Sequence, residues 1–328
     1  MSGDNHAAVD RGRRLSGTEL AAAIRTRVAS AAAALTTTGR TPRLAVVLAT
    51  KDESAAWYVR SIAKAAAAVG ISCDVVDLAP GATADDIRGT LRHLAADPTV
   101  HGVMLQTPLP PGVEFTEVAT TIDPAKDVDG ANPASLGRLA SGLSAFAPAT
   151  AAAVLALLDH HNVALAGRHA VVVGRSAVVG KPVAHLLLDR DATVTVCHSR
   201  TRDLTEHCRR ADVLVAAVGR PGLVTAQHVT PSSIVIDVGT TPTEDGGLAG
   251  DVAPEVAALV SGLTPVPGGV GPVTTALLLE HTVRATEEAT TRGPGGDMED
   301  RFKERARAAL NVVECQGVLS WRPPTSSP

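Results

Sequence analysis

Short apolar runs rich in β-branched residues alternate with helix-forming segments along this chain, and this alternation limits its fold more than any other feature. In the first half, strands are predicted at 42–49, 73–78 and 100–106, with helices at 54–69 and 82–98 between them. Strands that alternate with helices in this way indicate a parallel sheet covered by helices.

The second half repeats the alternation after a linking helix at 149–161. Its predicted elements are strands at 168–174, 192–198, 212–219 and 232–239 and helices at 181–190, 204–211 and 273–288. This order is typical of a nucleotide-binding sheet. We therefore predict an α/β protein of two domains, an N-terminal catalytic domain and a C-terminal Rossmann-type domain with a parallel sheet.

The predicted boundaries follow from changes of pattern. A flexible lead-in covers 1–15, the first domain 16–152 and the second 153–290, with its last helix returning to the first domain; a linker and C-terminal extension cover 291–328. The first domain is expected to open on a helix capped by Ser16 or Thr18, since both residue types favour that position. A flexible stretch, one amphipathic helix and a disordered tail are predicted after Arg292.

Composition excludes several classes of protein. With 328 residues, 45% of them hydrophobic, the chain can bury the core of about two domains. A net charge of -4 argues against a nucleic-acid partner, and no apolar run reaches the roughly 18 residues of a membrane span. The N-terminus lacks the apolar core of a secretory signal. Four scattered cysteines indicate reduced thiols in a cytoplasmic protein and no metal site: Cys73, Cys197, Cys208 and Cys315.

The segment VVVGRSAVVGKP has the form of a phosphate-binding turn. A predicted strand ends at Gly174, and a helix begins near Pro182. Between them lie Arg175, Ser176 and Gly180, where the free N–H groups of a helix start attract phosphate. The alternative is a glycine-rich turn that only serves packing.

The end of the next strand indicates which nucleotide fits. NAD sites usually place an acidic residue there, whereas this chain has His198, Ser199 and Arg200. Together with Arg175, these residues can hold a 2′-phosphate, because arginine offers forked, permanently charged donors. NADP is therefore predicted. Two further turns, at 238–240 and 267–272, contain the glycines that let a backbone approach a nicotinamide ring.

Taken together, the motifs resemble those of the methylenetetrahydrofolate dehydrogenase/cyclohydrolase family over about residues 16–290. They are WYVRSIAKAAAAVGI, HGVMLQTPLP, PAKDVDGANP, GRSAVVGKP, ATVTVCHSRT, VIDVGT, GDV and TPVPGGVGPVT. The resemblance implies oxidation of 5,10-methylenetetrahydrofolate with NADP, followed by hydrolysis of the methenyl product to 10-formyltetrahydrofolate. It also implies a homodimer formed through the cofactor domain.

The resemblance assigns roles residue by residue. Tyr58 stacks on the folate, Gln106 supports a catalytic lysine, and Asp129 holds the pteridine. It places Pro108, Gly271 and Pro272 at the substrate, and Val238, Thr240 and Thr274 at the cofactor. For Asp129 a local alternative stays open, because a DG pair often forms a turn capped by the aspartate side chain.

One departure from the family pattern Y-V-x-x-K-x-K changes the expected chemistry. Ile62 occupies the position of the catalytic lysine, and isoleucine cannot transfer a proton. Lys64 and Arg60 are each about 200° away around the helix, so neither replaces it. We therefore predict an NADP-dependent dehydrogenase with weak or lost cyclohydrolase activity. The alternatives are an ordinary bifunctional enzyme and a folate- and NADP-binding protein without catalysis.

Overall fold

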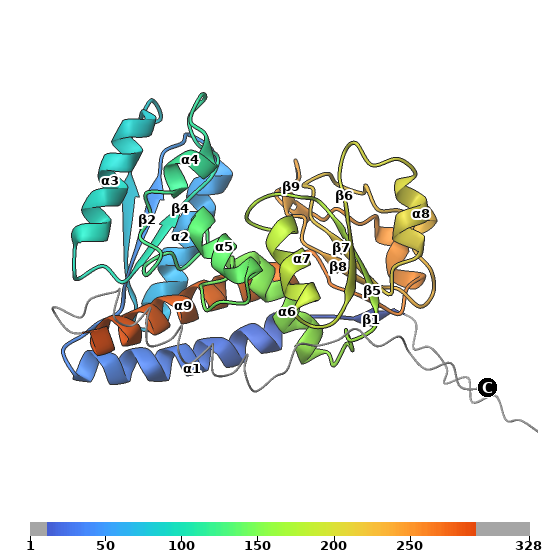
Figure 1. Cartoon of the computed structure of the whole chain (residues 1–328), viewed down its shortest axis with the longest axis horizontal. Helices are drawn as coiled ribbons and strands as arrows, with labels where there is room; N and C mark the ends of the chain where they lie inside the picture. Colours follow the sequence, from blue (N-terminus) through green and yellow to red (C-terminus); the bar gives the residue numbers. More distant parts are fainter. Residues whose placement is uncertain (1–11, 293–328) are drawn as a thin grey trace, which may run out of the picture. The chain divides into compact units, whose positions relative to one another are not determined.

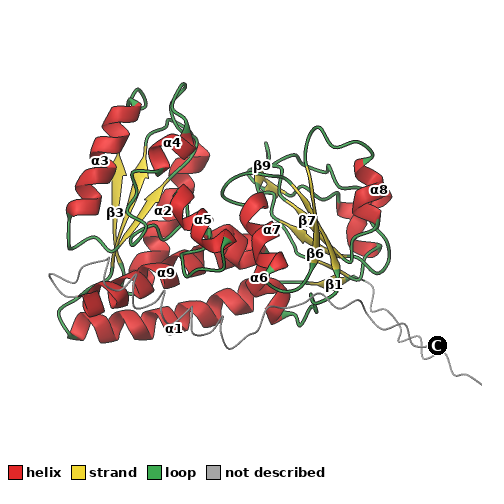
Figure 2. Ribbon diagram, viewed as in Figure 1, coloured by secondary structure: helices red, strands yellow, loops and turns green. Residues whose placement is uncertain are grey.

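Two parallel sheets, drawn as yellow arrows in Figure 2, organise the computed structural model, which describes residues 12–292. The first sheet has the strand order β3-β2-β4, formed by Ser72–Asp77, Arg43–Leu48 and Gly102–Leu105. Helices α2 (Glu53–Ala68) and α3 (Ala84–Ala96) connect these strands (Figure 1). The alternation of the first half therefore predicted this sheet correctly.

Strand β2 is buried on both faces. Its residues Leu44 and Val46 pack in one apolar cluster with Ile62 of α2, and Ala45 packs in another with Ile87 of α3. Neighbouring side chains of a strand point to opposite faces, so α2 and α3 cover opposite sides of this sheet. A strand covered on both faces needs a continuous apolar run, as the sequence of β2 shows.

The second sheet has the order β1-β11-β8-β7-β5-β6 and is parallel throughout. Its strands, from β1 to β6 in that order, are Arg13–Arg14, Gly262–Leu263, Ile234–Asp237, Val213–Ala216, His169–Val173 and Thr193–Cys197. The chain leaves β5 to one side for β6 and then crosses to the other side for β7 and β8. This reversal lies between β5 and β7 and is the position where open α/β sheets bind their ligands.

The remaining elements connect and cover the sheets. Among the described residues they are α1 (Thr18–Thr37), α4 (Phe115–Ala119), α5 (Pro133–Ala140), α6 (Ala149–His160), α7 (Gly180–Leu188), α8 (Leu204–Arg209), α9 (Val270–Arg292), the short 3-10 turns Ala226–His228 and Pro254–Ala258, and the antiparallel pair β9 (Thr241–Pro242) and β10 (Leu248–Ala249). Helices α1 and α9 lie side by side (Figure 1), and Arg27 forms an ion pair with Glu280 across them at 2.9 Å.

Three predictions about element boundaries were wrong. Residues 13–15 are not a loose lead-in, because Arg13–Arg14 pairs with β11 and Leu15 is fully buried. The N-cap of α1 is Gly17, which makes no side-chain cap hydrogen bond. Only glycine fits there, because a Cβ would lie 2.1 Å from the carbonyl oxygen of Gly269. Helix α9 begins at Val270, which brings part of the expected loop 264–272 into its first turn. The linker, helix and tail predicted from 293 onward, and the lead-in up to residue 11, lie outside the described residues.

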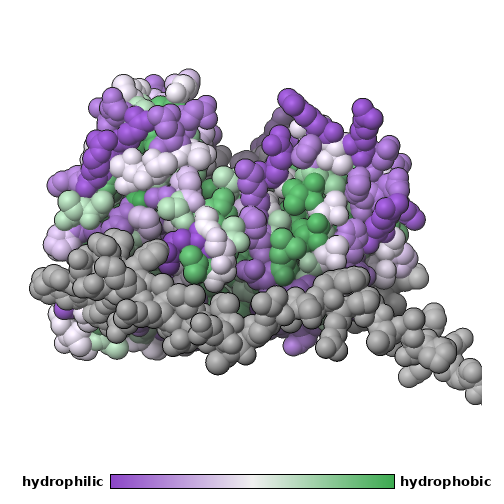
Figure 3. Space-filling model, in the orientation of Figure 1, coloured by the Kyte–Doolittle hydropathy of each residue, from purple (hydrophilic) through white to green (hydrophobic). Residues whose placement is uncertain are grey.

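Hydrophobic residues gather in three clusters inside the described part of the chain. The face drawn in Figure 3 shows mostly hydrophilic residues, with hydrophobic ones in separate small patches. Residues 12–292 include no helix that is both long and apolar enough to cross a membrane.

Candidate active site

The turn after β5 is built on two glycines that leave no room for a side chain. Gly174 has a φ of +125°, and a Cβ there would lie 2.1 Å from the carbonyl oxygen of Ala217. A Cβ on Gly180 would lie 2.1 Å from the carbonyl oxygen of Gly174. These glycines do serve packing, as the alternative interpretation held. Arg175 and Ser176 between them are exposed and available to a ligand at the start of α7.

Strands β5 and β6 bring two of the predicted cofactor segments together. The amide of Gly174 donates to the carbonyl of Cys197 at 2.9 Å, so the turn after β5 lies beside the loop after β6. In that loop His198 Nδ1 accepts from the amide of Arg200 at 3.1 Å, while the Ser199 and Arg200 residues are exposed. The turn after β5 and the loop after β6 therefore each carry an exposed arginine, Arg175 and Arg200.

Three residues from separate elements meet on the folate side. Burial and the negative charge of Asp129 raise the pKa of Tyr58 to about 12, and a hydrogen bond with the hydroxyl of Thr275 opposes the rise. Tyr58 lies on α2, Asp129 in the KDVDG loop and Thr275 in α9. The sequence reasoning did not single out Thr275; its place beside Thr274 in the loop-to-helix segment was the available signal.

The two aspartates of KDVDG have different tasks. Asp127 is fully buried, and its carboxylate accepts from the amides of Ala131 at 2.8 Å and Asn132 at 2.9 Å and from Ser135 Oγ at 2.6 Å. Asp127 therefore caps the loop, the local role considered for Asp129.

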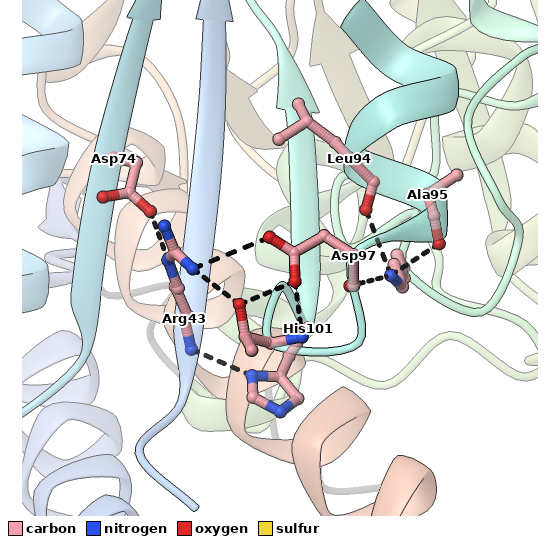
Figure 4. Close-up of polar contacts among 8 residues, drawn as sticks. Arg43, Asp74, Leu94, Ala95, Asp97 and His101 are labelled. Atoms are coloured by element: carbon pink, nitrogen blue, oxygen red, sulfur yellow. Dashed lines mark hydrogen bonds and ion pairs between the residues drawn. The ribbon is translucent and has the colours of Figure 1, made fainter. Parts of the chain in front are cut away.

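Lys126 anchors the start of the same loop. Its ammonium donates to the carbonyls of Leu94, Ala95 and Asp97 at 3.1, 2.7 and 2.7 Å. These three acceptors, labelled in Figure 4, lie at the C-terminal end of α3. A cation at this position also meets the negative end of the helix dipole. The sequence reasoning gave Lys126 no task.

Asp129 is held in place by its neighbours on both sides. Gly130, with a φ of +62°, packs so closely that a Cβ would lie 2.4 Å from the Pro148 nitrogen. Burial lowers the pKa of His281 to about 4, so its ring is neutral and Nδ1 donates to the carbonyl of Val128 at 2.8 Å. Burial and the charge of Asp127 raise the pKa of Asp129 to about 7, opposed by the amide of Ala149. New N–H donors from a ligand would favour the charged form of this carboxylate.

Asp129→Asn is expected to stabilise the ligand-free protein, more at about pH 8 than at about pH 5. The pKa is raised from 3.8 to about 7 on folding, so the unfavourable burial of the charge grows between these values and is absent below them. We expect a gain of about 1–3 kcal/mol in the free energy of unfolding at about pH 8, measured by urea denaturation. Asp86→Asn is the control of opposite sign, because Thr83 lowers the pKa of Asp86. A gain independent of pH would contradict the account.

Ile62 departs from the family pattern, and Gln106 is the matching residue expected to support a lysine at that position. Ile62 is fully buried in the apolar cluster, whereas Arg60 and Lys64 are exposed, so the prediction that neither shares its face is confirmed. Gln106 is 9% exposed and donates from Nε2 to the carbonyl of Thr107 at 2.6 Å. Its Oε1 is buried without a hydrogen-bond partner in the described structure. The resemblance assigns Gln106 to support a lysine ammonium, but its Oε1 has no such donor among the described residues.

The other predicted residues lie at loop ends and a helix start. Pro108 follows a cis peptide bond after β4 and is exposed. Gly271, Pro272 and Thr274 lie in the first turns of α9, and Thr274 is buried with its hydroxyl bonded to the carbonyl of Val270 at 3.2 Å. Val238 and Thr240 follow β8. Within residues 12–292, no three potential metal ligands form a group.

Comparisons with known proteins agree over both halves. The family model described as the catalytic domain of tetrahydrofolate dehydrogenase/cyclohydrolase matches residues 15–129, and its NAD(P)-binding domain matches 148–290. "Bifunctional protein FolD 1" of Saccharopolyspora erythraea is 68% identical over 276 residues, which are 84% of this chain and 94% of the relative. The corresponding protein of Rhodococcus jostii is 62% identical over 283 residues, 85% of this chain and 95% of its own.

Solved structures show the same similarity in three dimensions. The bifunctional FolD methylenetetrahydrofolate dehydrogenase/cyclohydrolase of Campylobacter jejuni is 38% identical with a TM-score of 0.81, covering 84% of this chain and 98% of the other. The Trypanosoma brucei dehydrogenase-cyclohydrolase, complexed with NADP and an inhibitor, is 36% identical with a TM-score of 0.80, covering 84% and 97%. The predicted resemblance is confirmed, and the chain belongs to the tetrahydrofolate dehydrogenase/cyclohydrolase family.

Proposed function

We propose that this protein oxidises 5,10-methylenetetrahydrofolate to 5,10-methenyltetrahydrofolate with NADP. The observation that carries the proposal is the KDVDG loop, which the carboxylate of Asp127 and the ring of His281 hold in place around Asp129. The charge of Asp129 also acts on Tyr58 of α2. Relatives named as bifunctional FolD proteins, and a neighbour solved with NADP, support both ligands. The cytoplasmic homodimer suggested by the sequence and the resemblance stays a prediction.

The residues of the site orient the reactants. When bound, NADP would supply the acceptor for the hydride of the methylene carbon, and the lone pair of the adjacent folate nitrogen would stabilise the cationic product. Tyr58 offers a rigid aromatic face for stacking. Asp129 accepts hydrogen bonds from the amino-pyrimidine edge, and such bonds favour its charged form. Hydride transfer needs alignment more than a proton relay, so Ile62 does not obstruct this step.

The turn after β5 and the loop after β6 fit the phosphate groups of NADP. Two glycines draw the backbone in where a Cβ would collide, and Arg175 and Arg200 are exposed beside it. Both segments lie at the carboxyl ends of neighbouring strands, the edge at which such sheets bind dinucleotides.

Arg175→Ala is expected to lower kcat/KM for NADP about 10- to 100-fold, with a change below about twofold for NAD. The loss corresponds to one charged hydrogen bond to the 2′-phosphate, which NAD lacks. Steady-state rates with each cofactor measure this preference. Arg202→Ala is the matched control, because Arg202 is also exposed after β6. Equal losses with both cofactors would refute a 2′-phosphate contact.

Hydrolysis of the methenyl product is the second candidate activity. The names of the relatives favour the bifunctional alternative over our prediction of weak or lost hydrolysis. That prediction rests on Ile62, which is fully buried. The buried Oε1 of Gln106 has no hydrogen-bond partner in the described structure, which is consistent with a missing lysine. An ordinary bifunctional enzyme with this sequence requires another group or a bound water to move the proton.

Two assays on the full-length protein separate the three functions. NADPH formation from NADP and methylenetetrahydrofolate tests the dehydrogenase, and loss of methenyltetrahydrofolate tests the cyclohydrolase. Activity in both identifies the bifunctional enzyme. Activity in the NADPH assay alone supports the prediction that Ile62 weakens or abolishes hydrolysis. Binding of both ligands without turnover identifies a binding protein.

A further inference from the structure

Two buried carboxylates at the carboxyl edge of the second sheet have no task in the function proposed above. Asp251 is fully buried, and its carboxylate accepts from the amides of Val218, Gly219 and Arg220 at 2.6, 3.1 and 2.7 Å. A single side chain from the GDV motif therefore holds three successive amides of the loop after β7.

Asp237 holds Asp251 in turn. It is 4% exposed, and its carboxylate accepts from the amides of Gly239, Asp251 and Val252 at 2.9, 2.9 and 3.0 Å. Asp237 thus fixes the turn after β8 and the backbone that carries Asp251. Asp237 holds the backbone of Asp251, and Asp251 holds the loop after β7, so hydrogen bonds connect the VIDVGT and GDV motifs.

A glycine packs closely against each of the two carboxylates. A Cβ on Gly250 would lie 1.9 Å from Oδ2 of Asp237, and a Cβ on Gly239 would lie 2.6 Å from Oδ1 of Asp251. Neither glycine can therefore carry a side chain without displacing the carboxylate that it contacts.

The loop that Asp251 holds lies at the reversal of the second sheet. It follows β7, the neighbour of β5 on the side opposite β6. The carbonyl oxygen of Ala217, at the start of this loop, is the atom that a Cβ on Gly174 would meet at 2.1 Å. The loop after β7 and the turn after β5 therefore lie together at the reversal of strand order, the position where such sheets bind dinucleotides.

We propose that Asp251, supported by Asp237, is a positioning residue that shapes the cofactor crevice for the nicotinamide half of NADP. The inference rests on the proposed function. With its 2′-phosphate beside the exposed Arg175 and Arg200, after β5 and β6, the dinucleotide would extend past β5 toward the loops after β7 and β8. Asp251 would act through the backbone of residues 218–220, which it holds by three hydrogen bonds.

Asp251→Asn tests this role with little change of volume. The asparagine keeps one acceptor oxygen but turns an NH₂ group toward amides that need an acceptor, so the loop after β7 must shift. Small displacements of reacting groups cost large factors in rate. We expect kcat/KM for NADP in the dehydrogenase assay to fall at least about tenfold, mainly through kcat.

Binding of adenosine 2′,5′-bisphosphate distinguishes the positioning role from general unfolding. Unfolding would weaken binding of this probe, whereas a shift of the loop after β7 would not. This probe has the 2′-phosphate but no nicotinamide, so its Kd in Asp251→Asn is expected to stay within about twofold of wild type. Asp212→Asn is the matched control. Asp212 Oδ2 accepts from the amide of His169 at 2.9 Å at the opposite end of β7, and this variant is expected to change neither value more than about twofold.

Asp237→Asn is the second variant in case Asp251→Asn does not fold. It weakens the same support indirectly and is expected to give a smaller kcat loss with unchanged binding of the probe. Equal losses of NADP turnover and probe binding, or unchanged turnover in a folded Asp251→Asn protein, would overturn the inference. A wild-type protein that binds neither NADP nor the probe would overturn the proposed function and the inference with it.

Discussion

Ile62→Lys is expected to raise the rate of methenyltetrahydrofolate hydrolysis at least about 100-fold over the wild-type protein. The wild-type rate is expected to be close to that of the uncatalysed reaction. A side chain that transfers protons typically contributes a factor of this size. Burial at this position would lower the pKa of the introduced lysine toward neutrality, where an amine serves best as acid and base. The resemblance assigns Gln106 to support a lysine at this position, and its Oε1 is buried without a hydrogen-bond partner in the described structure.

Ile62→Met is the matched control for this gain. Methionine has a similar volume and keeps the position apolar, so packing against Val59 and Ala66 of α2 is retained without proton transfer. NADPH formation should persist in both variants, which shows that the folate site is intact. Fast hydrolysis by the wild-type protein, unchanged in Ile62→Lys, would contradict the account and establish the bifunctional alternative.

Asp127→Ala is expected to lower the free energy of unfolding by about 3–5 kcal/mol. The substitution leaves the amides of Ala131 and Asn132 and the hydroxyl of Ser135 without their acceptor. Buried donors that lose a partner cost more than the net value of the bond. Urea denaturation measures the loss, and activity is expected to fall as the loop that carries Asp129 loosens.

Asp123→Ala is the control for Asp127→Ala. Asp123 Oδ1 accepts from the single amide of Ala125 at 2.9 Å, and the residue is half-buried. A loss of about 1 kcal/mol or less is expected there. A stability loss at Asp127 no larger than at Asp123 would show that the KDVDG loop does not depend on its first aspartate.

The main elements of both sheets follow from local patterns in the sequence. Each predicted β-branched run became a strand of one of the two sheets, and each helical segment between them became a connection. Strands β1 and β11 have two residues each, too few for any periodic pattern. They exist because Arg13–Arg14 and Gly262–Leu263 pair across the sheet, a contact between distant parts of the chain.

The candidate site could also be predicted only in part from local sequence. Tyr58, Gln106 and Asp129 stand in local motifs, and the roles predicted for them follow from the resemblance of those motifs to the family pattern. The local sequence could not decide which aspartate of KDVDG caps the loop, because both stand at turn-forming positions. The bonds of His281 to Val128 and of Asp251 to Val218 join residues 153 and 33 positions apart. Such contacts follow from the tertiary fold.

The most direct test is the initial rate of NADPH formation by the full-length protein with 5,10-methylenetetrahydrofolate. The account predicts turnover with NADP, a much lower kcat/KM with NAD, and loss of turnover in Asp129→Ala while that variant stays folded. Absence of NADPH formation by a protein that binds both ligands would contradict it.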